Sequence, residues 1–222
     1  MADMKSVKID GIYDLFTLRF LLTQNVEYVS FDMRPLSFNF LPGHVLVDLL
    51  SKMKGSIGDF YLQFADEKDF GIKKIIADAR SSLGPFKSFY LDFRGKENQS
   101  FCEQFGLPYT VDLPKHSLDE FLSSRLWQGV SLSFTHLQEL HGRGDFYLFA
   151  GQFANFIREK KRDGAFNVAL NLDWDENIFP SLFDLLPIDV LAFSINHKTE
   201  QAYRQIDCER IKHYLHGHLA AF

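Results

Sequence analysis

Three titratable side chains lie where strand-like apolar segments of the sequence end. Asp10 follows residues 7–9, Asp112 lies within residues 110–113, and His136 follows residues 130–134. Carboxylates and imidazoles are among the side chains that most often transfer protons in enzymes. We therefore take all three as candidates for proton transfer. The alternatives are a helix-capping role for Asp10 and solvated loop positions for Asp112 and His136.

Eight segments of strand length alternate with helical patterns, which is typical of parallel βα units. The predicted strands are residues 7–9, 28–33, 60–64, 88–93, 110–113, 130–134, 167–172 and 190–194. Their regular spacing, without a central reversal, favours a closed (β/α)8 TIM barrel of the α/β class over an open, doubly wound sheet. In such a barrel, groups at the carboxyl ends of the strands point into one shared mouth.

The helical patterns are less uniform than the strands. Helices are expected over residues 15–22, 45–53, 68–83, 118–127, 146–161 and 207–219. Gly84-Pro85 is a stop signal for the third of them, and Ser117 is the expected N-cap of the fourth. Residues 146–150 also fit a strand, so both interpretations stay open there.

Composition indicates one globular domain spanning residues 1–222, because 46% of the residues are hydrophobic and no linker interrupts the chain. The net charge of −5 argues against nucleic acid as a partner. No apolar run is long enough to span a membrane. Cys102 and Cys208 are far apart and no signal peptide precedes them, so we expect a cytoplasmic protein. The 24 phenylalanines predict a Phe-rich core between helices and sheet.

Three motifs in order resemble those of phosphoribosylanthranilate isomerases. Residues 8–12, Lys-Ile-Asp-Gly-Ile, are similar to the K-I-C-G-I segment of that family. Residues 31–40 keep Phe31, Pro35 and Ser37 in register with F-V-F-x-P-x-S-P-R-Y, and residues 91–97 keep Gly95 and Glu97 of V-Q-L-H-G-D-E. With residues 188–194 similar to the last strand of the family, the likeness covers essentially the whole chain.

The resemblance implies a cytoplasmic, cofactor-free and metal-free enzyme of tryptophan biosynthesis. Its reaction is an Amadori rearrangement of an aminoaldose phosphate, which needs a base at C2 and an acid at the ring oxygen. The cysteine that serves as the base in the family corresponds to Asp10, and the related isomerase of histidine biosynthesis has an aspartate there. The implied ligand is a small molecule of the phosphorylated-sugar or anthranilate type.

Several positions depart from the family pattern. The acid of the family corresponds to the segment 134–136, which has no carboxylate, so that Asp112 or His136 would have to substitute. The arginine that meets the substrate carboxylate is Asn39 here, and Arg34 is a candidate replacement. The family's histidine after the fourth strand is Arg94, which could instead pair with Asp10, Asp32 and Asp92.

The phosphate-binding glycines of the family are also missing. Residues 171–175 and 194–197 replace them, and Asp173 and Asp175 would repel a phosphate. Together with Arg34, Ser37, Asn39 and Arg94, we take Ser194 and Asn196 as candidate ligand-binding residues. A hard-cation site formed by Asp173, Asp175, His197 and Asp10 is a weaker alternative.

Two functions therefore compete. The first is a divergent isomerase that keeps proton transfer through Asp10. The second is a barrel that has lost catalysis and acts as a binding or interaction protein. An isomerase requires a second titratable group in the same cavity as Asp10, whereas a non-catalytic barrel could fill that cavity with aromatic rings and salt bridges.

Overall fold

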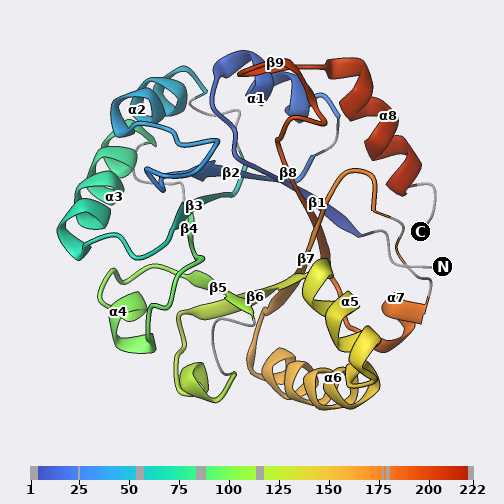
Figure 1. Cartoon of the computed structure of the whole chain (residues 1–222). Helices are drawn as coiled ribbons and strands as arrows, with labels where there is room; N and C mark the ends of the chain where they lie inside the picture. Colours follow the sequence, from blue (N-terminus) through green and yellow to red (C-terminus); the bar gives the residue numbers. More distant parts are fainter. Residues whose placement is uncertain are drawn as a thin grey trace.

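The computed structural model describes residues 5–24, 26–53, 58–83, 89–113, 118–176, 178 and 181–219. Eight strands form a closed barrel in which each strand pairs with the next along the chain and β8 pairs with β1. All eight pairings are parallel. Figure 1 looks along the barrel and shows the helices arranged around the strands. The predicted (β/α)8 TIM barrel is thus confirmed.

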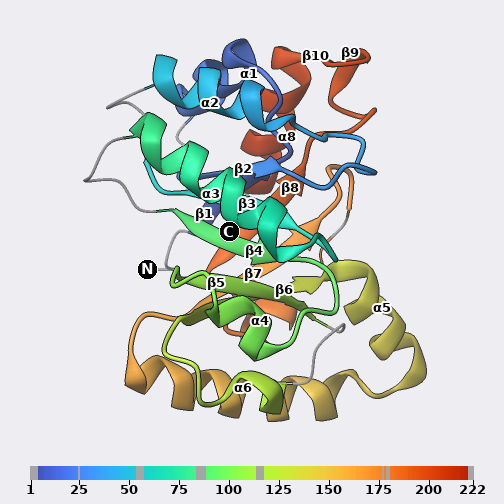
Figure 2. The same cartoon turned by 90° about the vertical axis from the view of Figure 1, so that its left-hand side faces the viewer.

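The strands of the barrel are short. They are β1 (Ser6–Asp10), β2 (Tyr28–Asp32), β3 (Phe60–Phe64), β4 (Tyr90–Phe93), β5 (Tyr109–Leu113), β6 (Trp127–Ser133), β7 (Asn167–Leu172) and β8 (Val190–Ser194). A two-stranded hairpin of β9 (Glu200–Ala202) and β10 (Gln205–Ile206) follows β8. In Figure 2 this hairpin and helix α5 both lie toward the right, at one end of the barrel.

The helices differ widely in length. They are α1 (Leu15–Leu22), α2 (Gly43–Lys52), α3 (Asp69–Leu83), α4 (Gln99–Glu103), α5 (Phe134–Arg143), α6 (Phe146–Asp163), α7 (Ser181–Leu185) and α8 (Cys208–Leu219), with a single 3-10 turn, η1 (Leu118–Phe121). Asp14 caps α1, because its carboxylate accepts the backbone N–H of Thr17 at 2.7 Å. None of the described helices is both long and apolar enough to cross a membrane.

Two sequence-based predictions around β6 are wrong. The helix predicted for residues 118–127 is only the 3-10 turn, because Trp127 already begins β6 and packs in the core against Phe121 and Phe166. Phe134, predicted as the last residue of a strand, is the first residue of α5, because the Ser133 side chain accepts the backbone N–H of His136 and starts the helix.

Helix α6 resolves the alternative left open at residues 146–150. These residues are helical, and Phe146, Ala150, Phe153 and Ile157 are buried at spacings of three or four residues. The strand interpretation of this segment is therefore wrong. Ser88, Ser117 and the Gly84-Pro85 stop signal lie outside the described residues.

The core between the barrel and its helices is rich in phenylalanine, as predicted. The largest fully buried side chains include ten phenylalanines, namely Phe31, Phe60, Phe64, Phe89, Phe93, Phe121, Phe134, Phe146, Phe153 and Phe193. Several stack in pairs, such as Phe60 and Phe89 with ring centroids 5.2 Å apart. This aromatic layer fixes the outer face of the sheet, so that the inner face is left for other side chains.

The inner face of the barrel is unusually polar. TIM barrels commonly fill their interior with branched apolar side chains, whereas here a small internal cavity is lined by Lys8, Tyr61, Thr110, Val130, Ser131, Asn167, Ala169 and Val190. Lys8 on β1 reaches Asp92 on β4, and these strands are not neighbours in the sheet. The contact therefore crosses the interior of the barrel.

Candidate functional site

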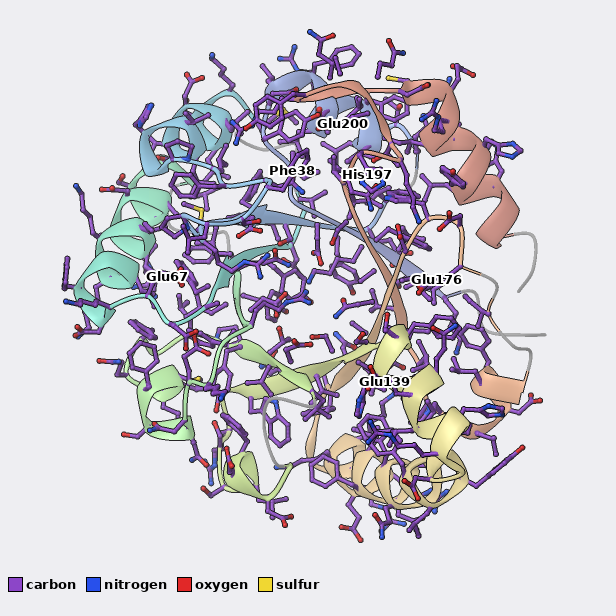
Figure 3. The ribbon with its side chains drawn as sticks, in the orientation of Figure 1. Phe38, Glu67, Glu139, Glu176, His197 and Glu200 are labelled. Atoms are coloured by element: carbon purple, nitrogen blue, oxygen red, sulfur yellow. The ribbon has the colours of Figure 1, made fainter. Side chains whose placement is uncertain are left out.

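A cavity of about 410 Å³ lies at the carboxyl ends of β1, β2, β3 and β8. It is lined by Asp10, Gly11, Asp32, Arg34, Ser37, Phe38, Asn39, Gln63, Ser194, Ile195, Asn196 and His197. In Figure 3, Phe38 and His197 lie close together over this part of the mouth, whereas Glu67 and Glu139 lie away from it. The mouth of the barrel is where TIM-barrel enzymes place their active sites.

Beneath the cavity, four charged side chains form a buried network. Lys8 Nζ lies 2.9 Å from Asp92 Oδ2 and 3.1 Å from Asp10 Oδ1. Arg94 Nη2 lies 2.8 Å from Asp92 Oδ2 and 3.1 Å from Asp10 Oδ2. Two cations and two carboxylates thus compensate one another, and Lys8, Asp10 and Asp92 are each less than 5% exposed.

Asp92 is the centre of this network. Besides the two cations, Gln63 Nε2 donates to Oδ2 at 3.2 Å and Thr110 Oγ1 donates to Oδ1 at 3.1 Å. Burial raises the pKa of a carboxyl group, but the charges of Arg94 and Lys8 outweigh it and hold the pKa of Asp92 well below its usual range. Burial lowers the pKa of Arg94, yet Asp92 and Asp10 raise it above its ordinary value.

A second ion pair forms the side of the cavity. Arg34 binds Asp32 with both ends of its guanidinium, Nε to Oδ1 at 2.8 Å and Nη2 to Oδ2 at 2.5 Å. The Ser37 hydroxyl donates to the same carboxylate. Burial lowers the pKa of Arg34, but the hydrogen bonds to Asp32 outweigh this effect, so that the pKa lies above its ordinary value. Arg34 is therefore engaged within the protein, and Asp32 pairs with it rather than with Arg94.

Asn39 locks three loops of the mouth together. Its side-chain Nδ2 donates to the backbone carbonyl of Ile195 at 2.6 Å, joining the loops after β2 and β8. Gly11, after β1, has a φ of +83°, and a Cβ on it would lie 2.3 Å from Asn39 Nδ2. Glycine is thus required there, both for its backbone conformation and for space. Asn39 Oδ1 is buried and has no hydrogen-bond partner among the described residues.

The loops after β7 and β8 are joined by a salt-bridged clasp, defined here as Asp173, Asp175, Asn196 and Lys198. Lys198 Nζ binds Asp173 Oδ2 at 2.5 Å and also binds Asp175. Asn196 Nδ2 donates to Asp173 Oδ1 at 3.0 Å. Burial raises the pKa of Asp173, but its hydrogen bonds from Lys198, the Trp174 backbone and Asn196 lower it overall.

Trp174 anchors the clasp to the barrel. Its indole stacks on Phe193 with ring centroids 4.9 Å apart, and Nε1 donates to the carbonyl of Ser194 at 2.6 Å. Among the described residues, no group of three or more histidine, cysteine or acidic side chains is placed to hold a metal ion. Asp173 and Asp175, which the hard-cation alternative invoked, instead bind Lys198.

The structure brings most of the predicted site residues together. Asp10, Arg34, Ser37, Asn39, Ser194 and Asn196 line the cavity, and Arg94 contacts Asp10 from below it. Asp112 accepts a hydrogen bond from Ser131 at 3.3 Å, and His136 packs its ring against Phe149 of α6. Neither of the last two is among the residues that line the cavity.

Among the cavity residues that were not predicted for a proton-transfer or ligand-binding role are Gln63 and His197. Gln63 lies on the inner face of β3, one residue before the strand ends, and His197 lies three residues beyond β8. Their positions near the carboxyl ends of predicted strands were the signal that could have identified them. Sequence motifs alone did not reveal them, because neither belongs to the three segments that carry the resemblance.

Comparisons with known proteins find similarity only in structure. No family model matches the chain, and no curated protein is significantly similar to it in sequence. The phosphoribosylanthranilate isomerase of Thermus thermophilus is similar with a TM-score of 0.66 and 16% identity, covering 97% of this chain and 98% of that chain.

Two further solved structures are similar to this chain in fold. A phosphoribosylanthranilate isomerase in complex with reduced 1-(o-carboxyphenylamino)-1-deoxyribulose 5-phosphate has a TM-score of 0.65 and 15% identity, covering 96% of this chain and 97% of that chain. A citrate synthase variant has a TM-score of 0.57 and 10% identity, covering 99% and 93%. The chain thus has the barrel fold of phosphoribosylanthranilate isomerases over nearly its whole length.

Proposed function

We propose that this barrel binds a sugar-like substrate in the cavity of its mouth and catalyses an Amadori-type aldose–ketose rearrangement with Asp10 as the base. The observation that carries the proposal is the presence of Asp10 and a second titratable group, His197, in the lining of one open cavity. A solved phosphoribosylanthranilate isomerase with the same fold holds an aminodeoxyribulose phosphate, which supports ligands of this general class.

The rearrangement requires two proton transfers. The ring oxygen of the aminoaldose takes a proton as the ring opens to an iminium ion, and a base then removes the proton from C2 to give an enolamine. Asp10 supplies the carboxylate, and His197 at the rim supplies the proton donor. Positioned acids and bases of this kind typically accelerate a reaction by about 10²–10⁴-fold.

Arg94 and Lys8 act as positioning residues. They hold the two carboxylate oxygens of Asp10 from below, at 3.1 Å each. An ionised carboxylate has about four lone-pair sites on its two oxygens, so these contacts leave Asp10 able to accept a substrate proton. Fixing a catalytic group in this way lowers the entropic cost of reaching the transition state.

A non-catalytic binding barrel is the second candidate. The observation that favours it is the pairing of Asp10 with two cations, which engages both oxygens of this carboxylate within the protein. The cavity itself argues for binding of some small ligand in either case, because it remains open and is lined by hydrogen-bonding side chains.

The test is direct observation of the rearrangement with purified protein. N-aryl ribosylamines and their 5-phosphates are incubated in deuterated buffer, and proton NMR follows formation of the 1-arylamino-1-deoxyribulose. We expect turnover that falls about 100-fold or more in Asp10→Asn. His197→Gln should reduce it strongly, whereas the matched variant His136→Gln should not, because His136 lies outside the cavity. Turnover that is unchanged in Asp10→Asn, or absent with every substrate, contradicts the proposal.

A further inference from the structure

We infer that the ligand of this cavity is a neutral, polyhydroxylated compound without a phosphate group. This inference deepens the proposed function and rests on it for the identity of the site. Three independent features of the mouth carry it. They are the internal pairing of its charges, a buried acceptor that lacks a donor, and the use of backbone N–H groups within the loops after β7 and β8.

The fixed charges of the cavity are already paired within the protein. Arg34 binds both carboxylate oxygens of Asp32 through Nε and Nη2. Asp10 lies between Lys8 and Arg94. A charged ligand would have to break one of these pairs or enter as an uncompensated charge, and both carry a large desolvation penalty. A neutral ligand avoids that penalty.

One buried acceptor points to what such a ligand supplies. Asn39 Oδ1 belongs to a cavity-lining side chain that is more than nine-tenths buried. It accepts no hydrogen bond from the described residues. A buried acceptor of this kind needs a donor. Hydroxyl groups donate hydrogen bonds, whereas an ionised phosphate offers mainly acceptors.

The loops after β7 and β8 are where barrels of this class commonly bind phosphate, through backbone N–H groups. In this chain several of those N–H groups are used internally. The amide of Asp173 donates to Glu176 at 2.7 Å, that of Trp174 to Asp173 Oδ1 at 2.8 Å, and that of Lys198 to Asn196 Oδ1 at 2.9 Å. The carboxylates of the clasp add like-charge repulsion against a phosphate.

Lys198 does not offset this repulsion, because both carboxylates of the clasp already bind its ammonium group. The clasp therefore occupies the region in which a phosphate group would otherwise bind. Together with the paired charges and the buried acceptor Asn39 Oδ1, it selects ligands whose polar groups are hydroxyls.

The experiment compares matched pairs of stable probes that cannot be turned over, ribitol with ribitol 5-phosphate and sorbitol with sorbitol 6-phosphate. Nitrogen-15 NMR of the wild-type protein reports on the side-chain amide of Asn39 and on the indole of Trp174, one of only two tryptophans. We expect at least one neutral probe to shift the Asn39 amide with a Kd of about 1 mM, and its phosphate to bind about tenfold more weakly or worse.

A gain-of-function variant tests the clasp itself. Asp173→Asn combined with Asp175→Asn removes both carboxylates and frees Lys198, so the phosphate ester should gain about tenfold in affinity and shift the Trp174 indole. High salt should abolish this gain. Asp48→Asn, which breaks the surface ion pair of Asp48 with Lys52 on α2, is the control and should change nothing.

Three outcomes overturn the inference. They are a wild-type preference for the phosphate ester, no binding of any neutral probe at about 100 mM, and no gain for the phosphate ester in the double variant. The proposed function fails separately. If a neutral probe binds but no aldosylamine is rearranged, the ligand class stands and catalysis does not. If the gene rescues growth without tryptophan in bacteria lacking phosphoribosylanthranilate isomerase, and Asp10→Ala does not, isomerase activity stands and the exclusion of phosphate is refuted.

Discussion

Replacing Asp92 with asparagine should destabilise this protein more than almost any other isosteric change. The carboxylate is fully buried and contacts Lys8 and Arg94 at 2.9 and 2.8 Å. In Asp92→Asn both cations lose a carboxylate that they contact directly, while Asp10 remains as a shared partner of both. Breaking a buried ion pair in this way typically costs about 3–5 kcal/mol.

The double variant Lys8→Met with Asp92→Asn is a stricter test. It removes one charge of each sign, so the balance of charges is that of wild type, and Arg94 and Asp10 remain as a pair at 3.1 Å. We therefore expect the double variant to be within about 2 kcal/mol of wild type, although Lys8→Met alone is also costly. Urea denaturation followed by circular dichroism measures the free energies of unfolding.

The same cycle has a pH signature. The pKa of Asp92 is depressed in the folded state relative to about 3.9 in the unfolded chain. Its contribution to stability is therefore present above the unfolded pKa and is lost as the pH falls through the folded pKa. Below about pH 5, Asp92→Asn should lose less stability per pH unit than wild type.

Either of two results would refute a strong buried interaction between Asp92 and its two cations. One is a cost below about 1 kcal/mol for Asp92→Asn, which would mean that the network is not desolvated as the burial indicates. The other is a double variant whose cost equals the sum of the single costs, which would mean that Lys8 and Asp92 do not interact. Asp48→Asn, at an exposed pair, serves as the reference and should cost less than about 1 kcal/mol.

Two further substitutions test the packing of the mouth. Gly11→Ala should destabilise the fold by about 3 kcal/mol in thermal denaturation, because it combines a positive φ with a clash against Asn39, whereas Gly106→Ala, with a positive φ but open space, should cost only about 1 kcal/mol. Equal costs for the two substitutions would show that the clash with Asn39 does not contribute. Trp174→Phe should cost about 1–3 kcal/mol by leaving the Ser194 carbonyl without its indole donor, and no loss in urea denaturation would show that water replaces that donor.

The sequence was sufficient for the strands and for much of the mouth. Residues 60–64, 167–172 and 190–194 were predicted with the bounds of β3, β7 and β8. Apolar runs of that length have few alternatives between turn signals. Arg94 pairs with Asp10 and Asp92, which was one of the two interpretations of this residue, because the carboxyl ends of β1 and β4 face the same mouth.

What could not be predicted depends on contacts that are distant in sequence. Lys8 and Asp92 are separated by 84 residues, and the curvature of the sheet from β1 to β4 places them face to face. Likewise, Trp127 begins a strand because Phe121 and Phe166 pack around it, which overrides the helical pattern before it. The clasp around Lys198 required both loops to be placed before its partners could be known.

The buried charge network also has a consequence for synthesis of the chain. Lys8, Asp10, Asp92 and Arg94 all come from β1 or from β4 and the residue after it, within the first half of the sequence. Chains emerge from the ribosome with the N-terminal half first. The four charges can therefore neutralise one another in a nascent half-barrel, before the strands that will seal it from water have been made.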